Sequence, residues 1–121
     1  MHWALYLILA VVVVLHFVLK SSRQISLKDA REYLQSGALL IDVRSIREFN
    51  SGHLPKAINL PLDDIESALP RRVKDKDKVL LLHCQGGARS GAAKSKLQEL
   101  GYTHAYNLGS YSRAARIISG K

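Results

Sequence analysis

Cys84 is the only cysteine of this 121-residue chain, and its neighbours are of the types that activate a thiol. It directly follows the run Val79–His83, which is typical of a buried strand. Gly86 and Gly87 come next, and they let backbone N–H groups turn toward an anion without obstruction by a Cβ atom. Residues 89–100 have the composition of a helix, whose positive N-terminal end would face this loop. We therefore expect a reactive thiolate at Cys84 rather than an inert buried thiol.

The spacing between Cys84 and Arg89 indicates which anion the loop holds. Four residues, Gln85 to Ala88, separate the cysteine from the arginine. Cysteine phosphatases have one residue more, so the shorter loop fits one extra sulfur atom better than a phosphate group. Arg89 adds a positive charge, and Ser90 is a candidate hydrogen-bond donor at the helix start. A phosphatase or arsenate reductase is the disfavoured alternative. A single thiol excludes an internal disulfide and a cysteine-based zinc site, and we predict no metal or cofactor.

The segments around this loop predict an α/β domain with a central parallel sheet. Short apolar runs typical of buried strands lie at residues 39–41, 57–60, 79–83 and 105–108. Patterns typical of helices lie at residues 26–36, 46–50, 62–69 and 89–100. Ser26 is expected to cap the first of these helices, and Pro70 to close the third.

The segment from Trp3 to Leu19 carries no charged side chain and is apolar on all faces. At a rise of about 1.5 Å per residue it spans roughly 25 Å, the short end of a membrane-spanning helix. It lacks the basic start and the small-residue cleavage pattern of a signal peptide. We therefore expect an uncleaved single-pass anchor over residues 1–20, inserted in the cell (inner) membrane through residues 3–19, with a cleaved signal peptide as the alternative.

Charge predicts the orientation of this anchor and the kind of partner. The net charge is +8, and all charged side chains lie at or after Lys20. Positive charge that follows the anchor places the domain of residues 21–121 in the cytoplasm, with the periplasm as the alternative. The basic residues are not interleaved with aromatic ones and form no nucleic-acid-binding motif, so nucleic acid is not an expected partner. A small anionic substrate and a negatively charged membrane surface fit the charge better.

The loop Cys84–Ser90 resembles the active-site loop of the rhodanese family, and other segments match the family in the same order. These segments are Ile41–Arg44, Glu48-Phe49, Gly52–Leu54, Ala57–Pro61, Leu100–Tyr102 and Asn107–Gly109. Together they cover nearly all of residues 24 to 110. The chain is most similar to the single-domain, phage-shock-type bacterial rhodaneses, which are exported proteins, and this favours the periplasmic alternative.

The resemblance implies a three-layer domain and a sulfurtransferase. Cys84 would take sulfur from thiosulfate or a persulfide donor, hold it as a persulfide, and pass it to a thiol or to cyanide. Arg89 would be the second catalytic residue. The residues implied to bind the substrate or the persulfide are Gln85, Gly86, Gly87, Ala88 and Ser90. The alternative is a carrier or binding module that passes a persulfide to a membrane partner without turnover.

The resemblance also implies that Asp42 and Arg44 support the site from a neighbouring strand end. From the residues themselves, Asp42 is expected to form a structural salt bridge. For Arg44, a salt bridge and substrate steering both remain open.

Three further side chains carry expectations about packing. His83 adjoins Cys84, but adjacent residues of a strand point to opposite faces, so we predict no general-base role for it. His53 is expected to fix the loop in which it lies. After Gly109 the second glycine and the downstream tryptophan usual in the family are missing, and Tyr111 is expected to take over the packing role. The family's substrate mouth borders this region, which leaves substrate preference open.

Overall fold

The computed structural model describes residues 1–120, apart from the side chains of Ser21 and Ser22, and it has the predicted α/β architecture. The strands are β1 (Leu39–Asp42), β2 (Ile58–Asn59), β3 (Leu80–His83) and β4 (Ala105–Gly109). They form one sheet in the order β2-β1-β3-β4, and all neighbours are parallel. Because β3 lies between β1 and β4, the residue that follows β3 lies where three strand ends meet, the usual ligand position of such sheets. That residue is Cys84.

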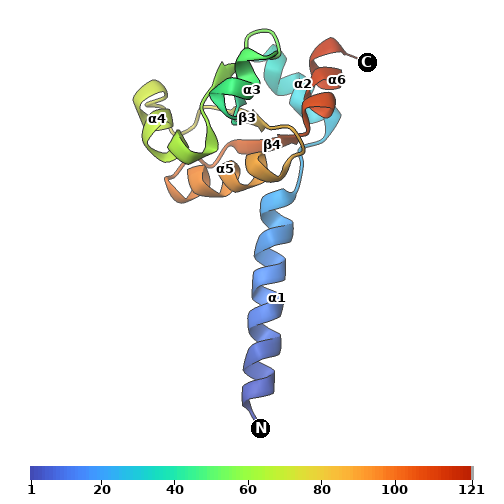
Figure 1. Cartoon of the computed structure of the whole chain (residues 1–121), viewed down its shortest axis with the longest axis vertical. Coiled ribbons are helices and arrows are strands. Elements are labelled where there is room, and N and C mark those ends of the chain that lie inside the picture. Colours follow the sequence, from blue (N-terminus) through green and yellow to red (C-terminus); the bar gives the residue numbers. More distant parts are fainter. Residues whose placement is uncertain (121) are drawn as a thin grey trace.

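Helices cover both faces of the sheet, as expected for a three-layer domain (Figure 1). The first layer is α2 (Leu27–Gln35) and α6 (Tyr111–Ser119), and the second is α4 (Ile65–Arg72) and α5 (Ala88–Glu99). Alternate residues of β3 separate the two cores, since Leu81 packs with the first layer while Leu80 and Leu82 pack with the second. The short α3 (Ile46–Asn50) follows β1, and a 3-10 turn (Leu62–Asp64) leads into α4.

Side-chain caps fix the starts of α2 and α3. The Oγ of Ser26 accepts a hydrogen bond of 3.1 Å from the Asp29 amide, as predicted for the start of α2. Ser45 and Glu48 form a reciprocal capping box at the start of α3. This capping box places the Glu48 carboxylate beside the end of β1, where it becomes part of the candidate site.

The structure corrects one expectation about a helix boundary and adds one helix that was not predicted. Pro70 does not close the third predicted helix, because α4 continues through it to Arg72. The hydrogen bond that Pro70 cannot make would have gone to the carbonyl of Glu66, an exposed residue, while the Val73 amide still bonds the Leu69 carbonyl at 2.8 Å. The prediction also missed α6, which begins directly after β4 with Ser110 as its cap.

The leader segment forms one long helix, α1 (Trp3–Ser22), which projects from the domain (Figure 1). Among residues 1–120 it is the one helix long and apolar enough to cross a membrane, with a mean hydropathy of 2.3 over Trp3–Lys20. None of that stretch is buried against the rest of the chain. Only its C-terminal end meets the domain, where it contacts α5.

Candidate active site

The Cys84 sulfur lies in a cradle of backbone amides at the start of α5. Cys84 is 1% exposed. Its Sγ accepts a hydrogen bond of 2.9 Å from the Gly87 amide and a longer one, 3.4 Å, from the Ser90 amide. Gly87 precedes α5 with a φ of +103°, a left-handed conformation that L-residues with a Cβ rarely adopt. The predicted arrangement of strand, glycine loop and helix start is therefore present, and it directs N–H groups at the sulfur.

Among the described residues, the Ser90 hydroxyl is the one side-chain group that bonds the sulfur. Its Oγ lies 3.4 Å from Cys84 Sγ and 2.6 Å from the Asn107 side-chain oxygen. The hydroxyl has a single proton, which it can donate to only one of these acceptors at a time. Asn107 is held in turn by the Gly109 amide at 2.8 Å and by the Gly87 carbonyl at 3.2 Å. The Ser90 hydroxyl can thus accept a hydrogen bond from the thiol or donate one to the thiolate without leaving its place.

These contacts favour the ionised sulfur. Burial opposes the charge and by itself raises the pKa of Cys84. Hydrogen bonds from the Ser90 hydroxyl and from the amides of Ser90, Gly87 and Gly86 outweigh burial, so that the pKa of Cys84 lies below its ordinary value. The stabilisation of the thiolate therefore comes mainly from neutral donors in direct contact with the sulfur.

Asp42 and Arg44 form a buried ion pair beside this cradle. The Arg44 Nη2 lies 2.8 Å from Asp42 Oδ2, and its Nε lies 3.0 Å from both carboxylate oxygens. Arg44 also donates to the Gly52 carbonyl at 2.8 Å and reaches the Gln85 side-chain oxygen at 3.5 Å. The structural salt bridge expected of Asp42 is present. Through Gln85 the same arginine contacts the active loop.

Arg89 binds a carboxylate, and this pairing was not predicted from the sequence. Its guanidinium forms two hydrogen bonds with Glu48, of 2.6 and 3.0 Å. This pairing lowers the pKa of Glu48 to about 2 and raises the pKa of Arg89, with a smaller contribution from the nearby Cys84 charge. Arg89 therefore lies within the electrostatic reach of the sulfur, but Glu48 and not the thiolate is its contact partner.

His83 lies on the opposite side of the strand from the thiol, as predicted. Its ring is fully buried, packs edge-on against Tyr111 at 5.7 Å, and has its Nε2 3.6 Å from Asp42 Oδ2. Burial lowers the pKa of His83, which favours the neutral imidazole. Tyr111 also packs under Arg44, whose Cζ lies 4.8 Å from the ring centroid, so this ring contacts both His83 and Arg44. His53 stacks on Phe49 and bonds its carbonyl, and so holds the loop after α3.

Only some of the predicted site residues therefore surround the Cys84 sulfur. Cys84, Gly86, Gly87 and Ser90 form the cradle itself, whereas Gln85 and Ala88 are exposed on the outer side of the loop. Sequence reasoning missed Asn107, which orients Ser90 from β4, and Glu48, which binds Arg89. A signal existed for Glu48, since Ser45 and Glu48 have the spacing of a capping box. No comparable local signal marks Asn107, because its partners are contributed by distant segments.

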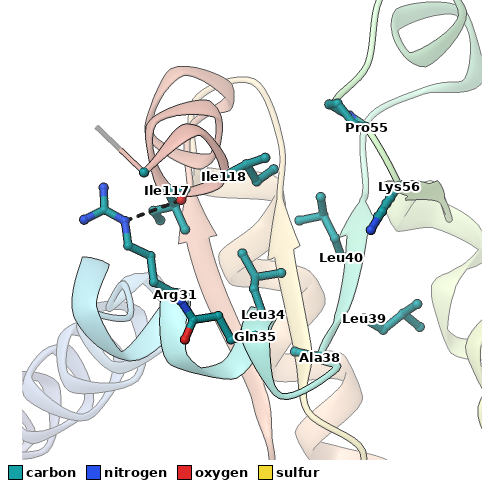
Figure 2. A pocket seen from close by; sticks show the side chains of 11 residues that line it. Arg31, Leu34, Gln35, Ala38, Leu39, Leu40, Pro55, Lys56, Ile117 and Ile118 are labelled. Atoms are coloured by element: carbon teal, nitrogen blue, oxygen red, sulfur yellow. Dashed lines mark hydrogen bonds between the residues drawn. The ribbon is translucent and has the colours of Figure 1, made fainter.

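A cavity of about 490 Å³ lies elsewhere, between α2, α6 and the loop before β2 (Figure 2). Leu34, Leu40 and Ile118 point into it, and none of the cradle residues lines it. The Arg31 guanidinium points away from the cavity, and its Nε donates a hydrogen bond of 3.4 Å to the Ile117 carbonyl of α6. Among the described residues, no cysteine, serine or histidine lines this cavity, so the cradle around Cys84 is the candidate active site.

The fold and the cradle together define a class of protein, an α/β domain that holds a single reactive thiol at a helix N-terminus. Residues 26–114, most of the chain, match the rhodanese-like domain family. The chain therefore belongs to the rhodanese-like domain family.

Known relatives narrow this class further. The chain is 39% identical over 69 residues to the thiosulfate sulfurtransferase PspE of Escherichia coli (strain K12), a match that covers 57% of this chain and 66% of that protein. It is 32% identical over 87 residues to the tRNA uridine(34) hydroxylase of Erwinia tasmaniensis, covering 65% of this chain and 25% of that protein. Among solved structures, a human single-domain sulfurtransferase matches with a TM-score of 0.65 at 32% identity, covering 77% of this chain and 95% of the other.

The chain spans less than two thirds of the length of both curated relatives. It is nevertheless a homologue of thiosulfate sulfurtransferases, which supports sulfur transfer as the general type of activity.

The contact between Ser90 and Cys84 leads to a testable prediction about the pKa of the thiol. Ser90→Ala removes the hydroxyl from the sulfur, so the pKa of Cys84 should rise and its alkylation profile should move to higher pH. We expect alkylation by iodoacetamide at neutral pH to slow roughly tenfold, because a hydrogen bond to a charged group contributes about 1.5 kcal/mol or more. Rates measured across pH on the full chain in detergent test this. Ser95→Ala, on the same helix but away from the sulfur, is the matched control, and coincident profiles for Ser90→Ala and the unaltered chain would contradict the prediction.

Proposed function

We propose that this protein is a sulfurtransferase that accepts sulfane sulfur from thiosulfate, or from a persulfide donor, on Cys84. The observation that carries the proposal is the Gly87 amide 2.9 Å from Cys84 Sγ, at the positive end of α5. A cradle of N–H groups stabilises an anion on sulfur whether that anion is the thiolate or the terminal atom of a persulfide. The enzyme thus uses one set of donors for both states of its nucleophile.

In the first step, the Cys84 thiolate attacks the outer sulfur of thiosulfate. A new S–S bond forms on Cys84, the bond between the outer sulfur and the sulfonate sulfur breaks, and sulfite leaves with the electron pair of that bond. The persulfide keeps one negative charge, which the amides of Gly86, Gly87 and Ser90 are placed to hold. Arg89 and Arg44 contribute positive charge at the loop. This charge reduces the electrostatic repulsion between the thiolate and the dianionic donor.

In the second step, a thiolate acceptor or cyanide attacks the terminal sulfur of the persulfide. The Cys84 thiolate is then the leaving group, and its lowered pKa favours its departure. The products are the acceptor's persulfide or thiocyanate, and no proton or cofactor is consumed in either step. A carrier without turnover would stop before this second step.

We also propose that residues 1–20 anchor the protein in the cell membrane and that residues 21–121 form the catalytic domain. The exposed, apolar α1 supports this assignment by its length and composition. Lys20 lies in the last turn of α1, and Arg23 and Lys28 follow the helix, which favours a cytoplasmic domain. A reducing compartment also suits a lone thiol that must stay reducible.

Intact mass spectrometry tests the persulfide directly. After treatment with thiosulfate, the mass should rise by one sulfur atom and return with a reductant, as attack of a thiolate on a sulfur donor requires. Cys84→Ser should abolish both the mass change and thiosulfate–cyanide turnover without unfolding the domain. No mass change in a protein whose Cys84 can still be alkylated would refute the sulfurtransferase function. A persulfide without turnover would favour the carrier.

Two charge variants test the division of roles between the arginine and the aspartate. Arg89→Ala should lower kcat/KM roughly tenfold or more, because it removes a preorganised charge and leaves the Glu48 carboxylate unpaired beside an anionic substrate. Asp42→Asn should have a smaller effect on turnover, since Asp42 acts through Arg44. Glu48→Gln is the control that removes the carboxylate alone. A folded Asp42→Asn protein with the greater loss of kcat/KM would reverse this assignment.

Protease protection tests the topology. With protease added to right-side-out spheroplasts, we expect the catalytic domain to stay intact, because positive charge after α1 retains it in the cytoplasm. Permeabilised spheroplasts, in which the domain should be digested, are the control. Digestion in intact spheroplasts would place the domain in the periplasm. A mature chain that begins near Ser21 would identify α1 as a cleaved signal peptide.

A further inference from the structure

The end of α1 is attached to α5 by a buried lysine that the sulfur chemistry does not use. Lys94 is 8% exposed, and its Nζ donates to the carbonyls of Lys20 at 3.0 Å and Arg23 at 3.4 Å. These carbonyls belong to the C-terminal end of α1, which has backbone acceptors without intrahelical partners. Burial and the charges of Arg23 and Lys20 lower the pKa of Lys94. The bonds hold α5 across the end of α1 (Figure 1).

A cleft of about 230 Å³ opens where these two helices meet. Phe17 and Lys20 line it from α1, and Ser95, Gln98 and Glu99 line it from one face of α5. If α1 crosses a membrane, Phe17 and Lys20 lie at the boundary between acyl chains and headgroups, where aromatic and basic side chains are enriched. The α5 side of the cleft then faces the headgroup layer.

The charges in this cleft are of both signs. Lys20 is positive and Glu99 is negative, both are exposed, and no ion pair joins them in the described part of the chain. Arg23 and Lys94 add positive charge on the Lys20 side. A purely anionic ligand would leave Glu99 unmatched or repelled. A ligand with a phosphate at one end and a primary ammonium at the other matches both sides.

We propose that the cleft between α1 and α5 binds the headgroup of an amine-bearing zwitterionic phospholipid, a phosphatidylethanolamine. The phosphate pairs with Lys20, the ammonium donates to Glu99 and Gln98, and one acyl chain runs along Phe17. Lys94 is the positioning residue, since its bonds to the α1 carbonyls keep the two walls of the cleft together. This inference rests on the proposed membrane anchor and is independent of the sulfur chemistry.

Native mass spectrometry of the full chain tests the proposal. The protein is released from nonionic-detergent micelles that contain equimolar palmitoyl-oleoyl phosphatidylethanolamine and phosphatidylglycerol, and the retained lipids are counted. We expect phosphatidylethanolamine to be retained about threefold more, in the range for an exposed ion pair. Glu99→Gln should abolish this preference, Lys20→Gln should lower retention of both lipids, and Glu32→Gln, an exposed carboxylate on α2, should change neither.

Equal retention of the two lipids, or a preference for phosphatidylglycerol, would overturn the headgroup assignment. Extraction of the same chain from membranes with alkaline carbonate tests the proposed anchor separately from the proposed lipid-binding cleft. A chain that stays in the membrane without a lipid preference overturns the cleft alone. A chain released by carbonate overturns both the anchor and the cleft. Thiosulfate turnover should be unchanged in Glu99→Gln, since this residue does not contact the cradle.

Discussion

The hydrogen bond from the Gly87 amide to the Cys84 sulfur requires a backbone that three segments must build together. Cys84 must follow the end of a central strand, Gly87 must take a left-handed φ, and α5 must start at the next residue. A Cβ on Gly87 would also lie 3.3 Å from the Gln24 side chain and 3.4 Å from the Gly109 backbone. The space behind the loop is therefore as restricted as its conformation, which makes glycine the residue that fits both requirements.

Charge around the cradle is arranged as two neutralised pairs rather than as bare cations. Arg44 is paired with the buried Asp42, and Arg89 is paired with Glu48 at the half-exposed mouth. A thiolate held by neutral amides stays ionised without a cation in contact, and such a cation would also lower the nucleophilicity of the sulfur. The carboxylates keep both arginines in place beside the loop, where their charge can attract an incoming anion. This division separates activation of the nucleophile from attraction of the substrate.

Local patterns determined what could be predicted from the sequence. The strand before Cys84 and the helix after it have strong periodicities, and the glycines between them restrict the loop, so the cradle was predictable. The pairing of Arg89 with Glu48 joins residues 41 positions apart and depends on how α3 packs beside α5, which no local pattern encodes. The link from Ser90 to Asn107 of β4 depends on the sheet order for the same reason. The helix after β4 was missed because it begins without an intervening loop.

Helix α1 and the loop Cys84–Ser90 are closer in structure than their separation in sequence suggests. After α1 ends, Gln24 pairs with Asn107 of β4, and the Ile25 amide bonds the Asn107 carbonyl at 3.0 Å. The chain therefore passes from α1 directly behind the residue that orients Ser90. Lys94 makes a second connection, from α1 to the helix whose N-terminus holds the sulfur. These two attachments connect the loop to α1 through β4 and α5, so they would set the distance from the proposed membrane at which the proposed sulfur acceptor reaches Cys84.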